Sequence, residues 1–279
     1  MTNKVENSEL KAAELLKQAP DISPQALGDS EFIKDYKVKY AYVAGSMVRG
    51  IASEEMVIRM GKAKLLAFFG TGGLSLEQIE SALHKIKNSL NSDEPFGMNL
   101  LCNPINPEFE DLTVDLYFKY GIHLVEASAF SQVTPSLVRY RVKGLSQNRD
   151  GSINIPNKIM AKISHPDVAN QFLSPPLEKI VSKLLESRKI TEEEAKLSKL
   201  IPTADDLTIE ANSGGHTDDG VAYALMPAML RLRDDAMSKY QYSKKIRVGA
   251  AGGLGTPHAI AAAFIMGADY VVTGSINQC

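Results

Sequence analysis

Near its end the chain reads Ile246-Arg-Val-Gly-Ala-Ala-Gly-Gly-Leu-Gly-Thr-Pro257 and, shortly afterwards, Ala268-Asp-Tyr-Val-Val-Thr-Gly-Ser275. Each stretch is a short run containing β-branched residues that ends in small residues, as a buried strand does before a tight loop. Residues 258–267 between them are rich in alanine and resemble a helix. Glycine has no Cβ, so the backbone at Gly252-Gly253 can approach a ligand closely. Two such strand ends side by side predict the phosphate site that follows strands 7 and 8 of a (β/α)8 barrel.

Six further strand candidates precede these two, each a short, mostly apolar run that breaks into Gly, Ser, Asn or Pro. Helical patterns fill most of the gaps, and two of them open on capping-box sequences, at Ser75 and Thr191. Strands alternating with helices predict an α/β fold with a parallel sheet, and eight units predict a TIM barrel, with an open doubly wound sheet as the alternative. The six earlier strands are predicted at residues 40–44, 65–69, 96–101, 122–127, 158–163 and 207–211.

The chain shows no linker, so we expect one barrel domain over residues 31–279 after an N-terminal arm, residues 1–30. A polar loop, 144–157, and an insertion of two helices before strand 6, about 165–206, are expected to shape the substrate pocket. The sequence ends four residues after Ser275, so the closing helix of the barrel is missing. This predicts either a C-terminally truncated barrel or a strand covered by something else.

The composition of the 279 residues is that of an ordinary globular protein, and the net charge of −2 favours neither nucleic acid nor a membrane surface as a partner. Two cysteines do not form a disulfide framework, which favours a reducing compartment. No run of 18 apolar residues and no signal-peptide pattern is present. We therefore expect a cytoplasmic protein.

The glycine-rich run 70–75 fits neither the G-x-G-x-x-G fingerprint nor a Walker A loop, so a Rossmann dinucleotide site is not predicted. The five histidines are not clustered with one another or with cysteines, so no metal site is expected. His216 follows a predicted strand end, where an imidazole could transfer a proton near neutral pH. A purely structural histidine is an equally good interpretation from the position alone.

Three of the polar residues within predicted strands raise the question of burial: Asn99, Lys162 and Glu210. Burying them is costly unless they meet partners of the opposite kind. A ring-shaped ligand with donors and acceptors, lying over the strand ends, would satisfy all three. The alternative for Lys162 is a solvated residue at the end of its strand.

Eight short motifs stand along the chain: Ala44-Gly-Ser-Met47, Gly50-Ile-Ala-Ser53, Met60-Gly-Lys-Ala63, Phe69-Gly-Thr-Gly-Gly-Leu74, Gly97-Met-Asn-Leu100, Ser213-Gly-Gly-His-Thr-Asp218, Gly252-Gly-Leu-Gly-Thr-Pro257 and Thr273-Gly-Ser-Ile-Asn-Gln278. Together they resemble the FMN-dependent, trans-acting enoyl reductases of bacterial polyketide and polyunsaturated fatty acid synthases, the PfaD-like branch of the nitronate monooxygenase superfamily. The resemblance runs from about Phe32 to Cys279. Jointly the motifs are specific, but singly only the Ser-Gly-Gly-His-Thr-Asp motif is.

The resemblance implies an FMN-binding barrel and assigns roles residue by residue. Lys162 would lie near N1 and O2 of the flavin, where a positive charge stabilises the anionic reduced ring. Asn99 would bond the same polar edge, and His216 corresponds to the active-site histidine of the superfamily. The flavin would lie along Gly45, Ser46 and Met47 and against Gly214 and Gly215, and backbone amides of Gly252, Gly253, Gly274 and Ser275 would hold its phosphate.

The implied reaction passes a hydride from NADPH or NADH to FMN and then to Cβ of a 2-enoyl thioester carried on an acyl carrier protein. His216 would orient or polarise the thioester, or help to protonate Cα. Arg139, Arg141 and Lys143 could contact an acidic carrier protein, although a solvated helix face is the more common role of such residues. A homodimer is left open.

Two alternatives are retained. The first is a nitronate monooxygenase (2-nitropropane dioxygenase-like) flavoenzyme; the insertion at 165–206 and the Thr217-Asp218 ending favour the reductase. The second is an inactive barrel fragment or docking component, because a phosphate site without a following helix loses dipole-oriented amides.

Overall fold

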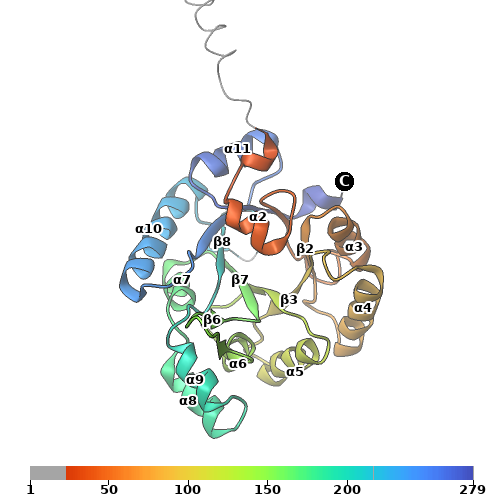
Figure 1. The fold of residues 1–279 in the computed structure, drawn as a ribbon. Coiled ribbons are helices and arrows are strands. Elements are labelled where there is room, and N and C mark those ends of the chain that lie inside the picture. Colours follow the sequence, from red (N-terminus) through yellow and green to blue (C-terminus); the bar gives the residue numbers. More distant parts are fainter. Residues whose placement is uncertain (1–22, 216, 279) are drawn as a thin grey trace, which may run out of the picture.

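The computed structural model describes residues 23–215 and 217–278, and within them eight parallel strands close into a barrel (Figure 1). The strands follow one another around the barrel in the order β1-β10-β9-β8-β7-β4-β3-β2. This confirms the predicted TIM barrel, and the alternative prediction of an open doubly wound sheet is wrong. Of the expected N-terminal arm, residues 1–22 lie outside the described residues. The strands are β1 Tyr42–Ala44, β2 Leu66–Phe69, β3 Gly97–Leu101, β4 Leu124–Ser128, β7 Lys158–Ile163, β8 Asp206–Glu210, β9 Arg247–Ala251 and β10 Val271–Thr273.

Helices surround the barrel, and most begin where the sequence supplies a side chain that caps the first turn (Figure 1). The predicted capping boxes at Ser75 and Thr191 are both formed. Among the described helices, none has the length and apolar character needed to cross a bilayer. The helices that follow barrel strands are α3 Glu54–Lys62, α4 Leu76–Ser89, α5 Pro107–Lys119, α6 Pro135–Val142, α7 Pro166–Leu173, α10 Ala222–Tyr240 and α11 Pro257–Ile265, and a 3-10 turn, η2 Ser275–Gln278, follows β10.

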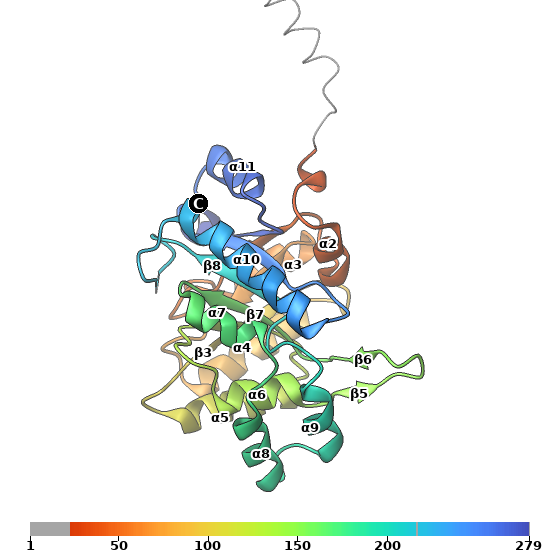
Figure 2. The same ribbon diagram turned by 90° about the vertical axis from the view of Figure 1, so that its left-hand side faces the viewer.

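The insertion before β8 contains three helices rather than two, because α7 already serves as the barrel helix after β7. The added pair, α8 Glu178–Glu186 and α9 Glu192–Ser198, packs against α6 on the outside of the barrel. The loop 144–157 forms a short hairpin, β5 Ser146–Gln147 and β6 Ile153–Asn154, which projects on the side of the barrel that carries α2, Ser30–Tyr36 (Figure 2). The expectation that the loop and the added helices shape a pocket at the strand ends is therefore wrong. The hairpin borders the opposite end of the barrel, and α8 and α9 lie on its outside.

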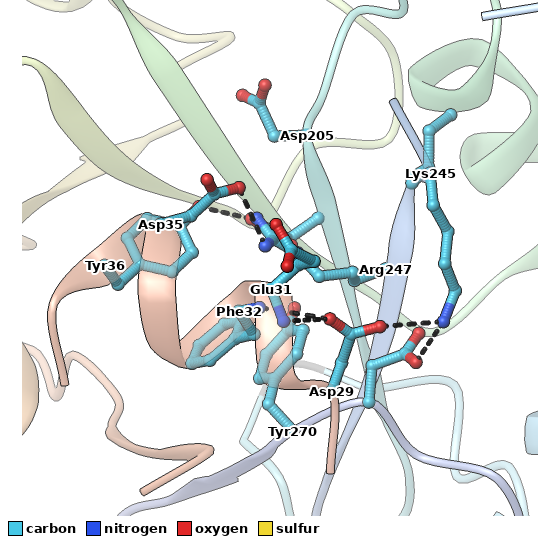
Figure 3. Close-up of polar contacts among 12 residues, drawn as sticks. Asp29, Glu31, Phe32, Asp35, Tyr36, Asp205, Lys245, Arg247 and Tyr270 are labelled. Carbon is cyan, nitrogen blue, oxygen red and sulfur yellow. Dashed lines mark hydrogen bonds and ion pairs between the residues drawn. The ribbon is translucent and has the colours of Figure 1, made fainter. Parts of the chain in front are cut away.

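Helix α2 closes the amino-terminal end of the barrel with two aromatic side chains, Phe32 and Tyr36 (Figure 3). The Phe32 ring stacks on Tyr270 from β10, with ring centroids 4.5 Å apart and planes 12° apart. Above them the barrel interior holds a small apolar core that includes Phe68 and Met160. Each fully buried side chain of this kind stabilises the fold by about 1.5–3 kcal/mol.

A buried ionic network joins α2 to the starts of β8 and β9. The Arg247 guanidinium donates to both carboxylate oxygens of Asp206, over 2.5 Å and 3.2 Å, and to Asp35 over 3.0 Å. It also lies 5.2 Å from the ring centroids of Phe32 and Tyr36 (Figure 3). Beside this network lies a cavity of about 590 Å³, bordered by the β5–β6 hairpin and the loop before β8. Ion pairs and aromatic contacts between α2 and the strands therefore stabilise this end of the barrel.

Candidate active site

The carboxyl ends of the eight strands meet at the other end of the barrel, and four neighbouring strands supply polar side chains there. Successive inward positions are two residues apart along a strand. Strand β8, for example, turns Asp206, Thr208 and Glu210 inward, from the closed end to the open end. Strands β3, β4, β7 and β8 contribute Asn99, Glu126, Lys162 and Glu210. We call these four residues the polar arc.

Lys162 and Glu210 form an ion pair within the polar arc. The Lys162 Nζ lies 2.9 Å from a carboxylate oxygen of Glu210, and both side chains are largely buried. Burial lowers the pKa of Lys162, but the charges of Glu126 and Glu210 raise it by more, so the pKa lies above its ordinary value. Lys162 is therefore a buried, charged side chain, and the alternative of a solvated residue at the end of its strand is wrong.

Glu126, on β4, belongs to the site but was not singled out from the sequence. Its side chain is fully buried, and its Oε2 accepts hydrogen bonds from the Ser46 backbone N–H, over 2.9 Å, and from the Ser46 hydroxyl. Its Oε1 has no hydrogen-bond partner among the described residues. The available signal was a carboxylate within an otherwise mostly apolar strand, the same signal that identified Glu210.

The amide of Asn99 is engaged inside the protein. Its Nδ2 donates to the Glu126 carbonyl oxygen over 3.0 Å and to the Ser128 hydroxyl over 2.8 Å. Its Oδ1 accepts from Thr71 over 3.3 Å. The structure thus brings Lys162 and Glu210 into contact, and places Asn99 two strands away from Lys162. That Asn99 bonds a ligand stays a prediction.

The remaining strands are each followed by a glycine, and we call these four residues the glycine arc: Gly252 after β9, Gly274 after β10, Gly45 after β1 and Gly70 after β2. A Cβ on Gly70 would lie 1.6 Å from the Met47 carbonyl oxygen, so only glycine fits there. Gly252 has φ +92°, and a Cβ would lie 2.5 Å from the Ala211 carbonyl oxygen.

The other predicted site residues border the two arcs. Gly214 and Gly215 lie against the Glu210 side chain, and the predicted Cβ position of Gly274 is 3.8 Å from the Met47 sulfur. Gly253 has open space around its Cα, and Ser275 begins the η2 turn. His216 lies outside the described residues, so its role stays a prediction.

The basic residues of α6 do not form a docking face. Arg139 is 8% exposed and pairs with Asp111 and Asp115, and Arg141 is fully buried and pairs with Asp205. Both the carrier-protein contact and the solvated helix face are therefore wrong for these two arginines. Ion pairs with these carboxylates, which are themselves only partly buried or exposed, account for the position of the two arginines.

The polar arc and the glycine arc together suit a flat ring with polar edges. The polar arc offers a cation and a buried carboxylate oxygen that lacks a donor among the described residues, and the glycine arc lies on the other side. Such an arrangement can hold a ring that carries both donors and acceptors, together with an anionic tail at the glycine-rich ends of β9 and β10.

No protein-family model matches the chain. Curated relatives are the polyketide biosynthesis proteins PksE of Bacillus subtilis, 55% identical over 92% of this chain, and ThaF of Burkholderia thailandensis, 48% identical over 94%. One of the polyunsaturated fatty acid synthase subunits of Thraustochytrium is 43% identical over 90% of the chain. The chain spans 34%, 22% and 17% of the lengths of these relatives.

Among solved structures, the enoyl reductase domain of MlnA, from the macrolactin biosynthesis cluster of Bacillus amyloliquefaciens, is 45% identical with a TM-score of 0.88, over 92% of this chain and 58% of that one. FabK of Thermotoga maritima, at 18% identity and TM-score 0.56 over 88% of this chain and 61% of its own, shares the fold. The chain is therefore, over most of its own length, a homologue of polyketide biosynthesis proteins, of polyunsaturated fatty acid synthase subunits and of the enoyl reductase domain of MlnA.

Proposed function

We propose that this barrel is an FMN-dependent enoyl reductase that acts in trans on 2-enoyl thioesters bound to acyl carrier protein, in polyketide or polyunsaturated fatty acid biosynthesis. The observation that carries the proposal is the charged Lys162, held beside two buried carboxylates and across the barrel from strands that end in glycine. The relationship to the enoyl reductase domain of MlnA supports the reaction class.

FMN fits the residues present. Lys162 would hold the N1 and O2 edge of the ring, and Gly45, Ser46 and Met47 would lie along its face. Backbone amides of Gly252, Gly253, Gly274 and Ser275 would hold the monophosphate. When bound, FMN supplies the hydride chemistry between NADPH or NADH and Cβ of the enoyl thioester. Lys162 would stabilise negative charge that develops on the ring.

Exposed apolar side chains around the mouth of the site support an acyl substrate. They lie on the loops and helix start that follow β1, β3 and β8, where the strands open toward solvent. Apolar side chains gathered around a polar site are typical of binding surfaces. These side chains are Val48, Ile51, Ile105, Val221 and Tyr223.

The decisive experiment follows the flavin. The purified protein is expected to be yellow or to become so with FMN, and to bleach when NADPH is added under nitrogen. Adding crotonyl thioester on a carrier protein should then restore the yellow colour and yield the saturated thioester. A reduced flavin that ignores the thioester but reacts with a nitronate in air would replace this proposal by the monooxygenase alternative. Failure to bind FMN at all would favour a docking component.

A further inference from the structure

A single oxygen in the site stands out: Oε1 of Glu126. Only two buried side-chain polar atoms of the described residues lack a hydrogen-bond partner, and the other one, Nε of Arg139, belongs to a guanidinium that is already paired on the outside of the barrel. A buried carboxylate oxygen without a donor is costly, so its retention calls for an explanation.

The surroundings of Glu126 show which way this oxygen faces. The other oxygen, Oε2, is held by both donors of Ser46, which fixes the orientation of the carboxylate. The Cβ position that Gly45 lacks would lie 3.4 Å from Oε1. Glu126 is also close enough to Lys162 to raise its pKa. Oε1 therefore faces the interior of the site, between Gly45 and the buried Lys162.

The chemistry of this oxygen selects its partner. A carboxylate oxygen accepts hydrogen bonds and cannot donate them. The polar edge of an oxidised flavin ring offers acceptors at N1, O2, O4 and N5 and a single donor, the imide N–H at N3. Lys162 can serve the acceptors, and the amide hydrogens of Asn99 are already used within the protein. The imide is therefore the ring group that Oε1 of Glu126 can bind.

We propose that Glu126 is a cofactor-binding residue that accepts a hydrogen bond from the imide N–H of the flavin, with Lys162 balancing its charge. This inference rests on the proposed function, because it requires FMN. A fixed negative charge at this place also disfavours the anionic reduced ring, so Glu126 lowers the flavin reduction potential.

The test compares FMN with 3-methyl-FMN, whose imide carries a methyl group in place of the hydrogen. Dissociation constants are measured by flavin fluorescence for the wild-type chain, Glu126→Ala and a control, Glu110→Gln. Glu110 is also a buried glutamate, but it lies on α5 and bonds Thr134 and the Asn103 backbone outside the barrel interior. Wild type and control should bind FMN at least about tenfold more tightly than 3-methyl-FMN, as expected for a hydrogen bond to a charged group.

Glu126→Ala should lose this discrimination, so that the two flavins bind within about twofold of each other. If Glu126 only supports the loop at Ser46, the variant will bind both flavins more weakly but keep their ratio, and that result would overturn the inference. An unchanged affinity for both flavins would overturn it as well. If the wild-type chain binds no FMN, the proposed function itself fails, and the two failures are thereby distinguished.

A second measurement uses Glu126→Gln, which keeps the shape of the side chain and can still accept from Ser46. Removing the charge should favour the reduced flavin by about tenfold or more, which raises the two-electron midpoint potential by about 30 mV. A potential equal to that of wild type would contradict a direct contact between Glu126 and the flavin.

Discussion

Replacing Arg247 by methionine should strongly destabilise the barrel, because it leaves the Asp206 carboxylate buried without its main partner. In the native structure Asp206 is fully buried and receives two hydrogen bonds from the Arg247 guanidinium and one from the Tyr36 hydroxyl. After the substitution only the Tyr36 hydroxyl remains among these donors. Breaking a buried pair in this way costs about 3–5 kcal/mol of unfolding free energy. For a chain of this size the loss corresponds to a drop in melting temperature of roughly 10 °C.

The pH dependence of the stability lost in Arg247→Met identifies the cause of that loss. Burial raises the pKa of Asp206 despite the opposing effect of Arg247, and removing the arginine will raise it further. A carboxylate with a raised folded-state pKa weakens the fold as the pH rises from its unfolded pKa, about 3.9, through the folded value. The deficit of Arg247→Met should therefore be largest near pH 8 and should shrink as the pH falls toward 5.

The assay is urea unfolding at several pH values, with two further variants. Arg247→Met combined with Asp206→Leu replaces the whole pair by apolar groups and should recover at least half of the lost stability, since such replacements are often nearly neutral. Lys85→Met, which removes an exposed cation beside Glu55, should cause no measurable change. A double variant as unstable as Arg247→Met, or a deficit that does not depend on pH, would refute the assignment of the loss to an uncompensated charge.

Three further predictions concern other parts of the barrel. His216→Ala should keep bound FMN, seen from its absorbance, but lose reduction of the enoyl thioester; unchanged turnover would remove the histidine from the mechanism. Gly70→Ala forces a Cβ to within 1.6 Å of the Met47 carbonyl oxygen, so FMN affinity should fall at least about tenfold, whereas Gly255→Ala, in open space, should bind FMN normally. The pKa of Asp111 is lowered because its lysine and arginine neighbours outweigh its partial burial, so wild type should lose stability below about pH 4 more steeply than Asp111→Asn in urea titrations.

The fold was largely predictable because its signals are local. Each strand is a short run ending in turn-forming residues, and the capping boxes at Ser75 and Thr191 rely only on residues three apart. The insertion was harder, because nothing in the sequence says which side of the barrel a helix pair will cover. The arginines of α6 show the same limit. Their burial depends on Asp111, Asp115 and Asp205, and Asp205 comes more than 60 positions later.

The site was predictable only in part, since period-two patterns identify inward positions but not contacts. Lys162 and Glu210 were recognised as polar residues in barrel strands, but their ion pair with each other was not predicted and is seen only in the structure. Glu126 carried the same signal, but its importance depends on Ser46, which lies 80 residues earlier and reaches it across the barrel interior. That contact determines which carboxylate oxygen of Glu126 is left without a hydrogen-bond partner among the described residues. No local sequence pattern encodes it.

The two inward carboxylates of strand β8 serve different ends of the barrel, one a structural ion pair and the other the candidate site. Its inward residues Asp206 and Glu210 are carboxylates four positions apart, and each faces a cation from a neighbouring strand. At the closed end, the planar fork of Arg247 satisfies both oxygens of Asp206, which leaves no capacity for a ligand. At the open end, Lys162 brings a compact charge to Glu210, and Glu126 lies close enough to raise the pKa of Lys162, while Oε1 of Glu126 keeps no partner among the described residues. Exchanging the two cations should therefore disable both ends: lysine at position 247 would leave a buried oxygen unpaired, and arginine at position 162 would occupy the acceptor that the flavin needs.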